Sequence, residues 1–466
     1  MNTRRISTVC HVGHTAIGGN NPIRIQSMAT VDTNDTEGCV AQAKRIIDAG
    51  GELVRFTTQG TREAENMKNI SARLKADGYT QPLVADVHFN ANVADVAARY
   101  CEKVRINPGN YVDPARTFKS LEYTDAEYAE ELKKIEARLL PFIKICKENH
   151  TAVRIGVNHG SLSDRIMSRY GDTPAGIVES CMEFLRIFKR EGFSDVVISI
   201  KASNTVVMVQ SVRMLVAAMD SEDMHFPLHL GVTEAGEGED GRIKSAVGIG
   251  ALLTEGIGDT IRVSLSEEPE CEIPVARKLV ELTNSLPLPM QKEGNQERMF
   301  IEGDTLHLYL DAPDYDTLQL KAAMAAGSIL IDRKATKLEI TTLTPCPSPL
   351  TPLADAILQA ARIKFTKTEY ISCPGCGRTL YNLQDTIRRI KAATSHLVGL
   401  KIGIMGCIVN GPGEMADADY GYVGAGRGKI SLYRRKECVA KNIPEEEAVS
   451  RLLQLIEEDG EMRNEK

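Results

Sequence analysis

The stretch AVRIGVN, residues 152–158, sets the fold expected for the first half of the chain. Its β-branched residues favour a strand, and helical stretches flank it at residues 126–149 and 174–190. A strand that alternates with amphipathic helices is typical of a parallel sheet in an α/β protein. The same strand-and-helix unit recurs on both sides of this stretch.

Eight such units fill residues 1–285. The other expected strands are residues 22–28, 52–58, 82–87, 103–108, 195–202, 227–232 and 259–265. Further helical stretches are residues 36–49, 61–76 and 205–219. Eight units predict a (β/α)8 TIM barrel rather than an open doubly wound sheet. The strands are not followed by a Gly-x-Gly-x-x-Gly loop, which argues against dinucleotide binding.

Polar side chains occupy the second halves of these strands, although strands of a closed barrel are buried on both faces and are expected to be apolar. The basic ones are Arg55, Arg105, Arg154, Lys201, His229 and Arg262. The others are Gln26, Asp86, His88, Asn107, Asn158, Glu234 and Ser264. The C-terminal ends of barrel strands meet at one mouth, where the active sites of this fold lie. We therefore expect these side chains to surround one pocket.

A single arginine in a strand is more often part of a salt bridge than a ligand contact. Clustering cations from five strands without an anion would cost several kcal/mol. The planar fork of a guanidinium group favours phosphate over a lone carboxylate. The pattern therefore predicts a site for a multiply charged anion, a phosphate or a diphosphate.

Composition limits the class of protein and its compartment. The chain has 466 residues, a net charge of −7 and 11 cysteines. At roughly 150 residues per domain we expect about three domains. The acidic balance argues against a nucleic-acid binder, and no apolar run reaches the roughly 18 residues of a membrane span. Residues 1–13 lack a signal-peptide pattern, so we expect reduced thiols and a cytoplasmic protein.

The composition changes after residue 285, which predicts three domains at residues 1–285, 286–365 and 366–466. Residues 286–298 are rich in proline and polar residues and are interpreted as a linker. The rest of the middle segment predicts a small α/β insert. Its expected strands are residues 305–310, 328–331 and 337–342, and its expected helices are residues 315–326 and 353–363. The last domain is expected to be α+β, with a helix at residues 380–393 and a strand at residues 400–405.

The last domain also carries a candidate metal site. SCPGCG at residues 372–377 and GCIVNGPGE at residues 406–414 place Cys373, Cys376 and Cys407 on loops rich in glycine and proline. Both a zinc ion and a cubane iron–sulfur cluster need a fourth ligand, for which Cys438 and Glu414 are the candidates. The residues alone leave zinc and iron–sulfur open. The other seven cysteines are interpreted as small buried apolar residues: Cys10, Cys39, Cys101, Cys146, Cys181, Cys271 and Cys346.

Nine motifs, in this order, resemble the 4-hydroxy-3-methylbut-2-enyl diphosphate synthase family, also called IspG or GcpE. They are IRIQSM (23–28), ADVHFN (85–90), KVRINPGN (103–110), RIGVNHGSLS (154–163), SIKASN (199–204), HLGVTEAG (229–236), GDTIRVSL (258–265), SCPGCGR (372–378) and GCIVNGPGE (406–414). The resemblance implies reductive ring opening of 2-C-methyl-D-erythritol 2,4-cyclodiphosphate in the non-mevalonate isoprenoid pathway. It also implies ferredoxin or flavodoxin as the electron donor.

The resemblance implies a role for each candidate residue. Cys373, Cys376, Cys407 and Glu414 would hold one 4Fe-4S cluster per chain, and Glu414 would release its iron to a substrate oxygen. The diphosphate would be bound by Arg55, Arg105, Arg154, Asn158, Lys201, Arg262 and Ser264. Glu234 would donate the proton, and Asp86 and His88 would orient the substrate. Gln26 and Asn107 complete the expected substrate-binding set.

The chain departs from the common two-domain form of this family. Its long loop at residues 110–132 resembles the large form of plants, chlamydiae and Bacteroidetes, but its insert is much shorter than theirs. We expect a homodimer. The alternative is a phosphate-ester-binding TIM-barrel enzyme with a structural zinc domain. A third class, a non-catalytic iron–sulfur carrier, gives no reason for a cationic barrel mouth.

Overall fold

The computed structural model describes residues 4–114, 120–286, 288–346, 348–379, 381–408, 411–415 and 417–460. Eight parallel strands form one sheet in the order β8-β7-β6-β5-β4-β3-β10-β9. They are β3 (Arg24–Met28), β4 (Leu53–Thr58), β5 (Leu83–Val87), β6 (Lys103–Ile106), β7 (Ala152–Asn158), β8 (Val196–Lys201), β9 (His229–Leu230) and β10 (Thr260–Ile261). A parallel bridge between Ile198 and Leu228 closes the sheet into a barrel. The predicted TIM barrel is therefore confirmed, and every strand lies within its expected range.

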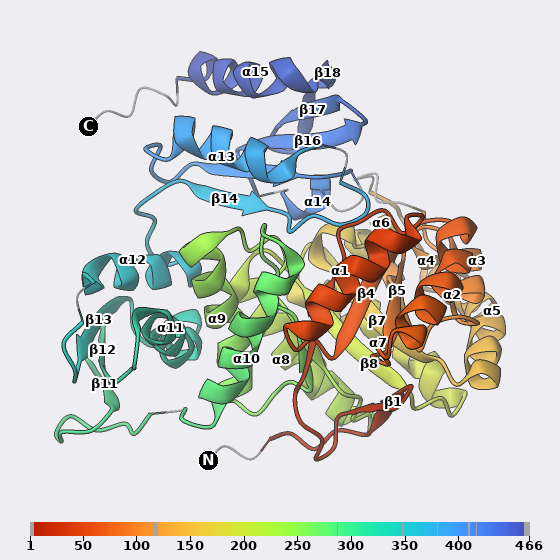
Figure 1. The fold of residues 1–466 in the computed structure, drawn as a ribbon, viewed down its shortest axis with the longest axis horizontal. Helices are drawn as coiled ribbons and strands as arrows, with labels where there is room; N and C mark the ends of the chain where they lie inside the picture. The colour runs from red at the N-terminus through yellow and green to blue at the C-terminus, as the bar shows by residue number, and fades with distance from the viewer. Residues whose placement is uncertain are drawn as a thin grey trace.

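Helices surround the barrel, as Figure 1 shows. They include α1 (Thr36–Asp48), α2 (Thr61–Ala76), α3 (Ala91–Ala97), α5 (Asp125–Asn149), α7 (Pro174–Arg190), α8 (Thr205–Ser221), α9 (Gly238–Thr254) and α10 (Glu272–Thr283). Shorter helices, α4 (Pro108–Tyr111), η1 (His159–Ser161), α6 (Asp164–Tyr170) and η2 (Pro269–Cys271), lie in the connections. The long loop predicted at residues 110–132 is described only in part, because residues 115–119 lie outside the described residues.

A hairpin of β1 (Cys10–Val12) and β2 (Thr15–Ile17) covers the end of the barrel where the strands begin. Its buried side chains pack against Leu53, Val84, Ala152 and Val197, which face the barrel interior. This end is therefore sealed by an apolar layer, and the opposite end remains for the mouth.

The insert packs against α9 through its long helix. It contains β11 (Arg298–Glu302), β12 (Thr305–Leu310), β13 (Lys337–Thr342), α11 (Tyr315–Ile331) and α12 (Leu350–Ala360). The strand predicted at residues 328–331 is wrong, because these residues form the last turn of α11. Gly327 allows α11 to lie close to α9, since a Cβ there would meet the Val247 carbonyl oxygen at 2.7 Å. The sequence of residues 328–331 could not reveal this, because a short buried apolar run has no periodicity that distinguishes a strand from a helix.

The C-terminal domain is a five-stranded sheet with helices and its own apolar core. Its strands are β14 (Glu369–Ser372), β15 (Lys401–Met405), β16 (Tyr420–Gly426), β17 (Lys429–Arg434) and β18 (Glu437–Pro444). Its helices are α13 (Leu383–Thr394), α14 (Gly411–Glu414) and α15 (Glu445–Glu458). The expected helix and strand are confirmed. Figure 1 shows this domain lying against the barrel.

The C-terminal domain covers the mouth of its own barrel. Ala235 and Ser372 form a parallel bridge, and the Ser266 hydroxyl donates a hydrogen bond to the Cys373 carbonyl at 2.9 Å. Gly160 and Gly413 allow the closest approach, because a Cβ at Gly413 would lie 1.6 Å from the Gly160 carbonyl oxygen. Larger residues at these two positions would push the domains apart.

Two of the seven cysteines interpreted as buried are not buried. Cys271 is exposed and Cys346 is partly exposed, whereas Cys10, Cys39, Cys101, Cys146 and Cys181 are buried. Cys271 lies in η2, a turn at the barrel surface, and Cys346 lies in the proline-rich loop before α12. Neither position belongs to the regular pattern of buried residues within a helix or strand.

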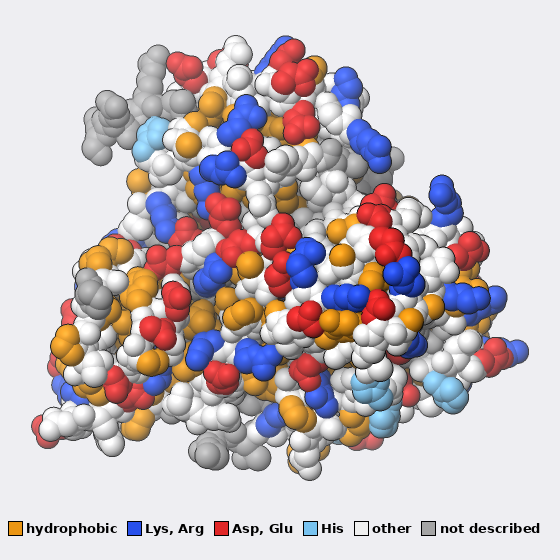
Figure 2. Space-filling view, in the orientation of Figure 1, with side chains coloured by type: hydrophobic (Ala, Val, Ile, Leu, Met, Phe, Trp, Pro, Cys, Tyr) orange, Lys and Arg blue, Asp and Glu red, His pale blue; other side chains and the backbone are white. Residues whose placement is uncertain are grey.

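The surface mixes charges of both signs. On the face in Figure 2, acidic and basic side chains are interspersed over the barrel and the C-terminal domain. Among the described residues, none of the helices combines the length and the apolar character that a bilayer crossing requires.

Candidate active site

The barrel mouth and the C-terminal domain together line one cavity, which is partly open to solvent. The predicted residues that line it are Arg55, Asp86, His88, Arg105, Arg154, Asn158, Lys201, Glu234, Arg262, Ser264, Cys373, Cys376 and Cys407. Side chains at alternate positions of a barrel strand point inward, so residues far apart in the sequence meet here. One cavity thus contains both the cations of the barrel and the three thiols.

Three of the cavity's cations lack a carboxylate partner. Within the described part of the chain, Arg55, Arg154 and Lys201 make no ion pair. Burial lowers the pKa of Lys201 well below its usual value, and Arg55 and Arg154 lower it further. The Nε and Nη2 atoms of Arg154 are buried without a hydrogen-bond partner. Buried cations left unpaired are costly, so this arrangement is stabilised when an anion enters the cavity.

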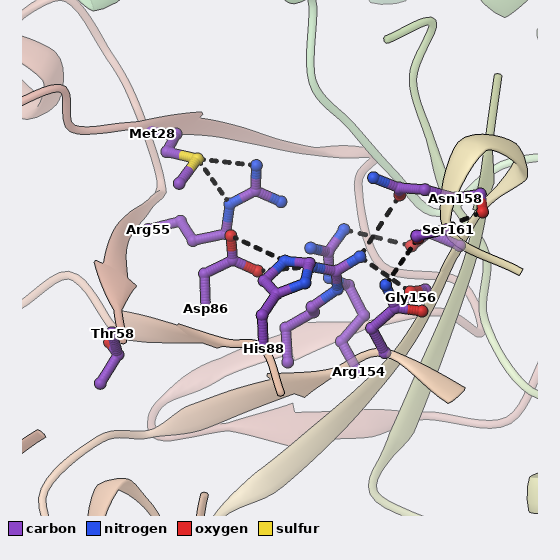
Figure 3. A network of polar contacts seen from close by, with 12 residues as sticks. Met28, Arg55, Thr58, Asp86, His88, Arg154, Gly156, Asn158 and Ser161 are labelled. Atoms are coloured by element: carbon purple, nitrogen blue, oxygen red, sulfur yellow. Dashed lines mark hydrogen bonds and ion pairs between the residues drawn. The ribbon is translucent and has the colours of Figure 1, made fainter. Parts of the chain in front are cut away.

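Arg55 makes its side-chain hydrogen bonds to sulfur. Its Nε and Nη2 atoms lie 3.1 and 2.8 Å from the Met28 Sδ atom, a contact visible in Figure 3. A thioether is a weak acceptor, so it does not neutralise the guanidinium group. Burial lowers the pKa of Arg55 to about 9, which leaves the group protonated at neutral pH. Arg55 is therefore available to an anionic ligand.

Asp86 lies on β5, beside the strand that carries Arg55, and holds Arg105 in place (Figure 3). Its Oδ1 atom accepts a hydrogen bond from Arg105 Nη1 at 2.9 Å, and Arg105 Nη2 donates to the Gly156 carbonyl at 2.8 Å. Burial alone would raise the pKa of Asp86, but Arg105 and Arg55 outweigh burial and hold the pKa well below its usual value. Burial lowers the pKa of His88 to about 3, so its ring is neutral at physiological pH. Asp86 therefore holds Arg105 in place, and His88 offers a neutral ring.

Glu234 has the properties of a proton donor. Its backbone has φ of 49°, in the left-handed region that non-glycine residues rarely adopt. Burial raises the pKa of its carboxyl group to about 7, against the opposing effects of Lys201 and Lys244. Its Oε2 atom is buried without a partner. A carboxyl group of this pKa is partly protonated at neutral pH and can transfer a proton to a ligand in the cavity.

The three thiols belong to two loops that meet at the cavity. The Gly406 N–H donates to Cys373 Sγ at 3.2 Å. A hydrogen bond with Cys407 holds the pKa of the Cys376 thiol well below its usual value, against burial and with help from Arg378. Among the described residues, no three His, Cys, Asp or Glu side chains gather closely enough to enclose one metal ion. A cubane cluster attaches each protein ligand to a different iron, and thiolates are the ligands it prefers.

Glu414 is buried between the two domains but does not line the cavity. Its Oε1 atom lies 3.4 Å from the Gly160 N–H, and its Oε2 atom is buried without a partner. Burial raises the pKa of its carboxyl group well above the usual value, and Glu234 raises it further. An unpartnered buried carboxyl oxygen is chemically suited to be a hard ligand for an iron atom.

Four further sequence candidates do not line the cavity. His229 is buried on β9, with its Nδ1 atom 3.3 Å from Thr260 Oγ1, and its predicted place at the pocket is wrong. Gln26 is buried with both polar side-chain atoms unpartnered, and it does not line the cavity. Asn107 caps α4, accepting from the Gly109 N–H at 3.1 Å, and donates to Ser161 Oγ at 2.8 Å. Cys438 lies on β18 with its sulfur 3.6 Å from the Ala440 carbonyl, outside the cavity. The binding roles predicted for these last three residues remain predictions.

Arg378 is a charged residue of the cavity that the sequence patterns did not single out. It follows Cys376 in the SCPGCGR motif, and its Nη2 atom lies 3.4 Å from Asp86 Oδ2. Its Nε and Nη1 atoms are buried without partners. The motif is recognised by its cysteines, and nothing in their spacing shows that the arginine beside them reaches the barrel. Met28 and Thr233 also line the cavity and were likewise not singled out.

We expect the R378A variant to bind inorganic pyrophosphate about 10- to 100-fold more weakly, because a charge-assisted hydrogen bond contributes roughly 1.5–3 kcal/mol. Isothermal titration calorimetry measures this affinity. The matched control is R388A, which removes an exposed arginine of α13 that pairs with the nearby Asp385. Equal affinity in R378A and R388A would contradict a role for Arg378 in anion binding.

The sequence has clear relatives. It matches the GcpE TIM-barrel domain over residues 7–277 and the GcpE protein C-terminal domain over residues 369–458. It is 52% identical to the 4-hydroxy-3-methylbut-2-en-1-yl diphosphate synthase (flavodoxin) of Phocaeicola vulgatus, covering 98% of each chain. It is 51% identical to the enzyme of the same name from Bacteroides fragilis, covering 98% of this chain and 96% of that one.

The alignments are longer than the chain. The comparison with the Phocaeicola vulgatus protein extends over 604 positions, although this chain has 466 residues. That relative therefore has residues inside the aligned region for which this chain has no counterpart. The two matched domains leave residues 278–368 of this chain between them.

Proposed function

The chain belongs to the GcpE family, and we propose that it is a 4-hydroxy-3-methylbut-2-en-1-yl diphosphate synthase. Its substrate would be 2-C-methyl-D-erythritol 2,4-cyclodiphosphate. The observation that carries this proposal is the shared cavity, which is lined both by cations without carboxylate partners and by three thiols. A cyclic diphosphate held by those cations would lie next to the redox group.

Different residues of the barrel would have different roles in binding the diphosphate. Arg55, Arg154 and Lys201 would neutralise the diphosphate, and Asn158 and Ser264 would donate hydrogen bonds to its oxygens. Asp86 holds Arg105 at 2.9 Å in the position that the anion needs. Because these side chains come from separate strands of a rigid barrel, they are preorganised and lose little entropy on binding.

We propose one 4Fe-4S cluster per chain, held by Cys373, Cys376, Cys407 and Glu414. When bound, such a cluster supplies electrons one at a time at low potential. The exposure of the three thiols to the cavity favours this proposal over the structural zinc alternative, because a zinc ion with a purely structural role has no need to face the substrate site. The unpartnered oxygen of Glu414 supports a fourth, oxygen ligand.

Protons are also consumed. When the substrate and the product are both written with fully protonated phosphate groups, the ring opening consumes two electrons and two protons and releases one water molecule. The C2–O bond to the diphosphate breaks, and the C3 hydroxyl group leaves as water. Glu234 would protonate that hydroxyl, because its pKa of about 7 keeps a proton available at neutral pH.

The electrons would come from flavodoxin, the donor in the relatives' printed names, or from ferredoxin. We place the reaction in the cytoplasm, where thiols stay reduced. The C-terminal domain lies over the barrel of the same chain, which supports a site completed within one chain. The expected homodimer stays a prediction.

Anaerobic turnover tests the function directly. Purified without oxygen, the protein is expected to be brown, to contain four irons and four sulfides per chain for a 4Fe-4S cluster, and to convert the cyclic diphosphate with reduced methyl viologen. A colourless protein with stoichiometric zinc and no turnover would overturn the proposal. That result would favour the phosphate-ester enzyme with a structural zinc domain.

Arg154 tests the binding role of the barrel cations. We expect R154A to raise the KM for the cyclic diphosphate about 10- to 100-fold, since one charge-assisted contact is worth roughly 1.5–3 kcal/mol. Initial rates with reduced methyl viologen give this value. The control is R138A, because Arg138 pairs with Asp95 on the barrel exterior at 2.7 Å. An unchanged KM in R154A would show that the cationic mouth does not bind the substrate.

A further inference from the structure

A second hollow reaches one of the three thiols, Cys407, from the outside of the protein. Its walls include Gln59, Thr379, Cys407, Ile408 and Arg427, which come from both the barrel and the C-terminal domain. Cys407 lines this hollow and also the inner cavity. At this point, the wall that separates the hollow from the inner cavity is formed by the loop that carries Cys407. The rate of electron transfer falls steeply with distance. An electron donor seated in the outer hollow would therefore lie close to the proposed cluster ligand Cys407.

The rim of the hollow exposes an apolar side chain. Ile408, next to Cys407, is 59% exposed. Large apolar side chains at interfaces make contacts that exclude water, and transient electron-transfer complexes need only a small area of them. An exposed isoleucine beside a redox ligand therefore suits a partner that binds briefly and leaves.

The hollow carries charges of both signs, and Arg427 is the exposed cation with which an acidic partner would pair. Its carboxylates, Asp32 and Glu63, already accept local hydrogen bonds from Asn34 and Gly60. Arg427, in contrast, is exposed and makes no ion pair within the described part of the chain. The chain as a whole carries a net charge of −7, and acidic and basic side chains are interspersed on the face in Figure 2. A local cation then decides where such a protein docks.

We propose that this hollow is the docking site of an acidic flavodoxin-type electron donor, with the flavin edge against Ile408 and acidic side chains of the donor facing Arg427. This inference rests on the proposed function. Each encounter oxidises the donor by one electron and reduces the cluster site by one. Two encounters supply the two electrons that the ring opening consumes.

A donor switch tests the docking site. We expect R427E and I408S each to raise the KM for reduced flavodoxin about tenfold, and the effect of R427E to shrink at high salt. With reduced methyl viologen, a small donor that needs no docking surface, both variants are expected to match the wild type. That rate also reports that each variant is folded and loaded with its cluster.

Two variants serve as matched controls. V398S removes an exposed β-branched apolar side chain from the same domain, since Val398 is 55% exposed. K436E reverses an exposed charge in the turn between β17 and β18. Both are expected to leave the KM for flavodoxin unchanged. An unchanged KM in R427E and I408S, or an equal loss with both donors, would overturn the docking site. Absence of viologen turnover in the wild type would overturn the proposed function itself.

Discussion

Replacing Cys407 with serine is expected to remove the iron–sulfur cluster and to reduce turnover of the cyclic diphosphate to background. A serine hydroxyl is a poor substitute for a thiolate, the ligand that iron–sulfur clusters prefer. Cys407 also shares a hydrogen bond with Cys376, so its loss disturbs a second ligand. Iron and sulfide analysis of anaerobic protein, the visible absorption spectrum and the viologen-linked rate measure the effect.

The fold is expected to survive this change. The C-terminal domain has its own apolar core, built on residues such as Ile387, Ile402 and Leu452, and Cys407 is not part of it. Far-ultraviolet circular dichroism of C407S should therefore match that of the wild type. C438S is the control, since Cys438 lies outside the cavity. Iron loss in C438S together with full iron in C407S would show that the ligand set is misassigned.

Replacing Lys103 with methionine is expected to raise the free energy of unfolding by about 5 kcal/mol at pH 6. Lys103 is completely buried in the barrel, and its Nζ atom has no hydrogen-bond partner among the described residues. Burial, with a smaller contribution from Arg154, lowers its pKa from 10.5 to about 7. Each pKa unit corresponds to 1.36 kcal/mol of difference between the protonation states. Methionine has a similar shape and no charge to desolvate.

The pH dependence of this gain has a defined sign. The folded state holds the Lys103 proton less tightly than the unfolded state, so the wild type becomes more stable as the pH rises. The full penalty applies below about pH 7 and disappears as the pH approaches 10.5. The difference between K103M and the wild type should therefore be largest at pH 6 and shrink steadily toward pH 10.

Urea unfolding of the cluster-free protein at several pH values checks this prediction. K144M is the control, because the Lys144 side chain is 78% exposed and its charge needs no desolvation. A gain that does not change with pH would contradict desolvation as the cause. We also expect K103M to bind pyrophosphate more weakly, because the barrel interior loses a positive charge.

Much of the fold follows from local sequence patterns. The eight barrel strands lie within their expected ranges because β-branched runs between amphipathic helices are visible over a few residues at a time. The cationic mouth could also be expected, since burying a charged residue in a strand costs free energy unless a partner or a ligand compensates for it. The strand at residues 328–331 was predicted wrongly, because only the packing of α11 on α9 extends that helix.

Contacts between distant parts of the chain decided the rest. Arg378 meets Asp86 across 292 positions, and Glu414 meets Gly160 across 254. No periodicity or spacing encodes such pairs, because they depend on how two domains dock. The residue types that bind an anion and a metal could be recognised from their order alone. That the thiols face the barrel of their own chain, with Arg378 between them and Asp86, depends on the close fit of Gly160 against Gly413.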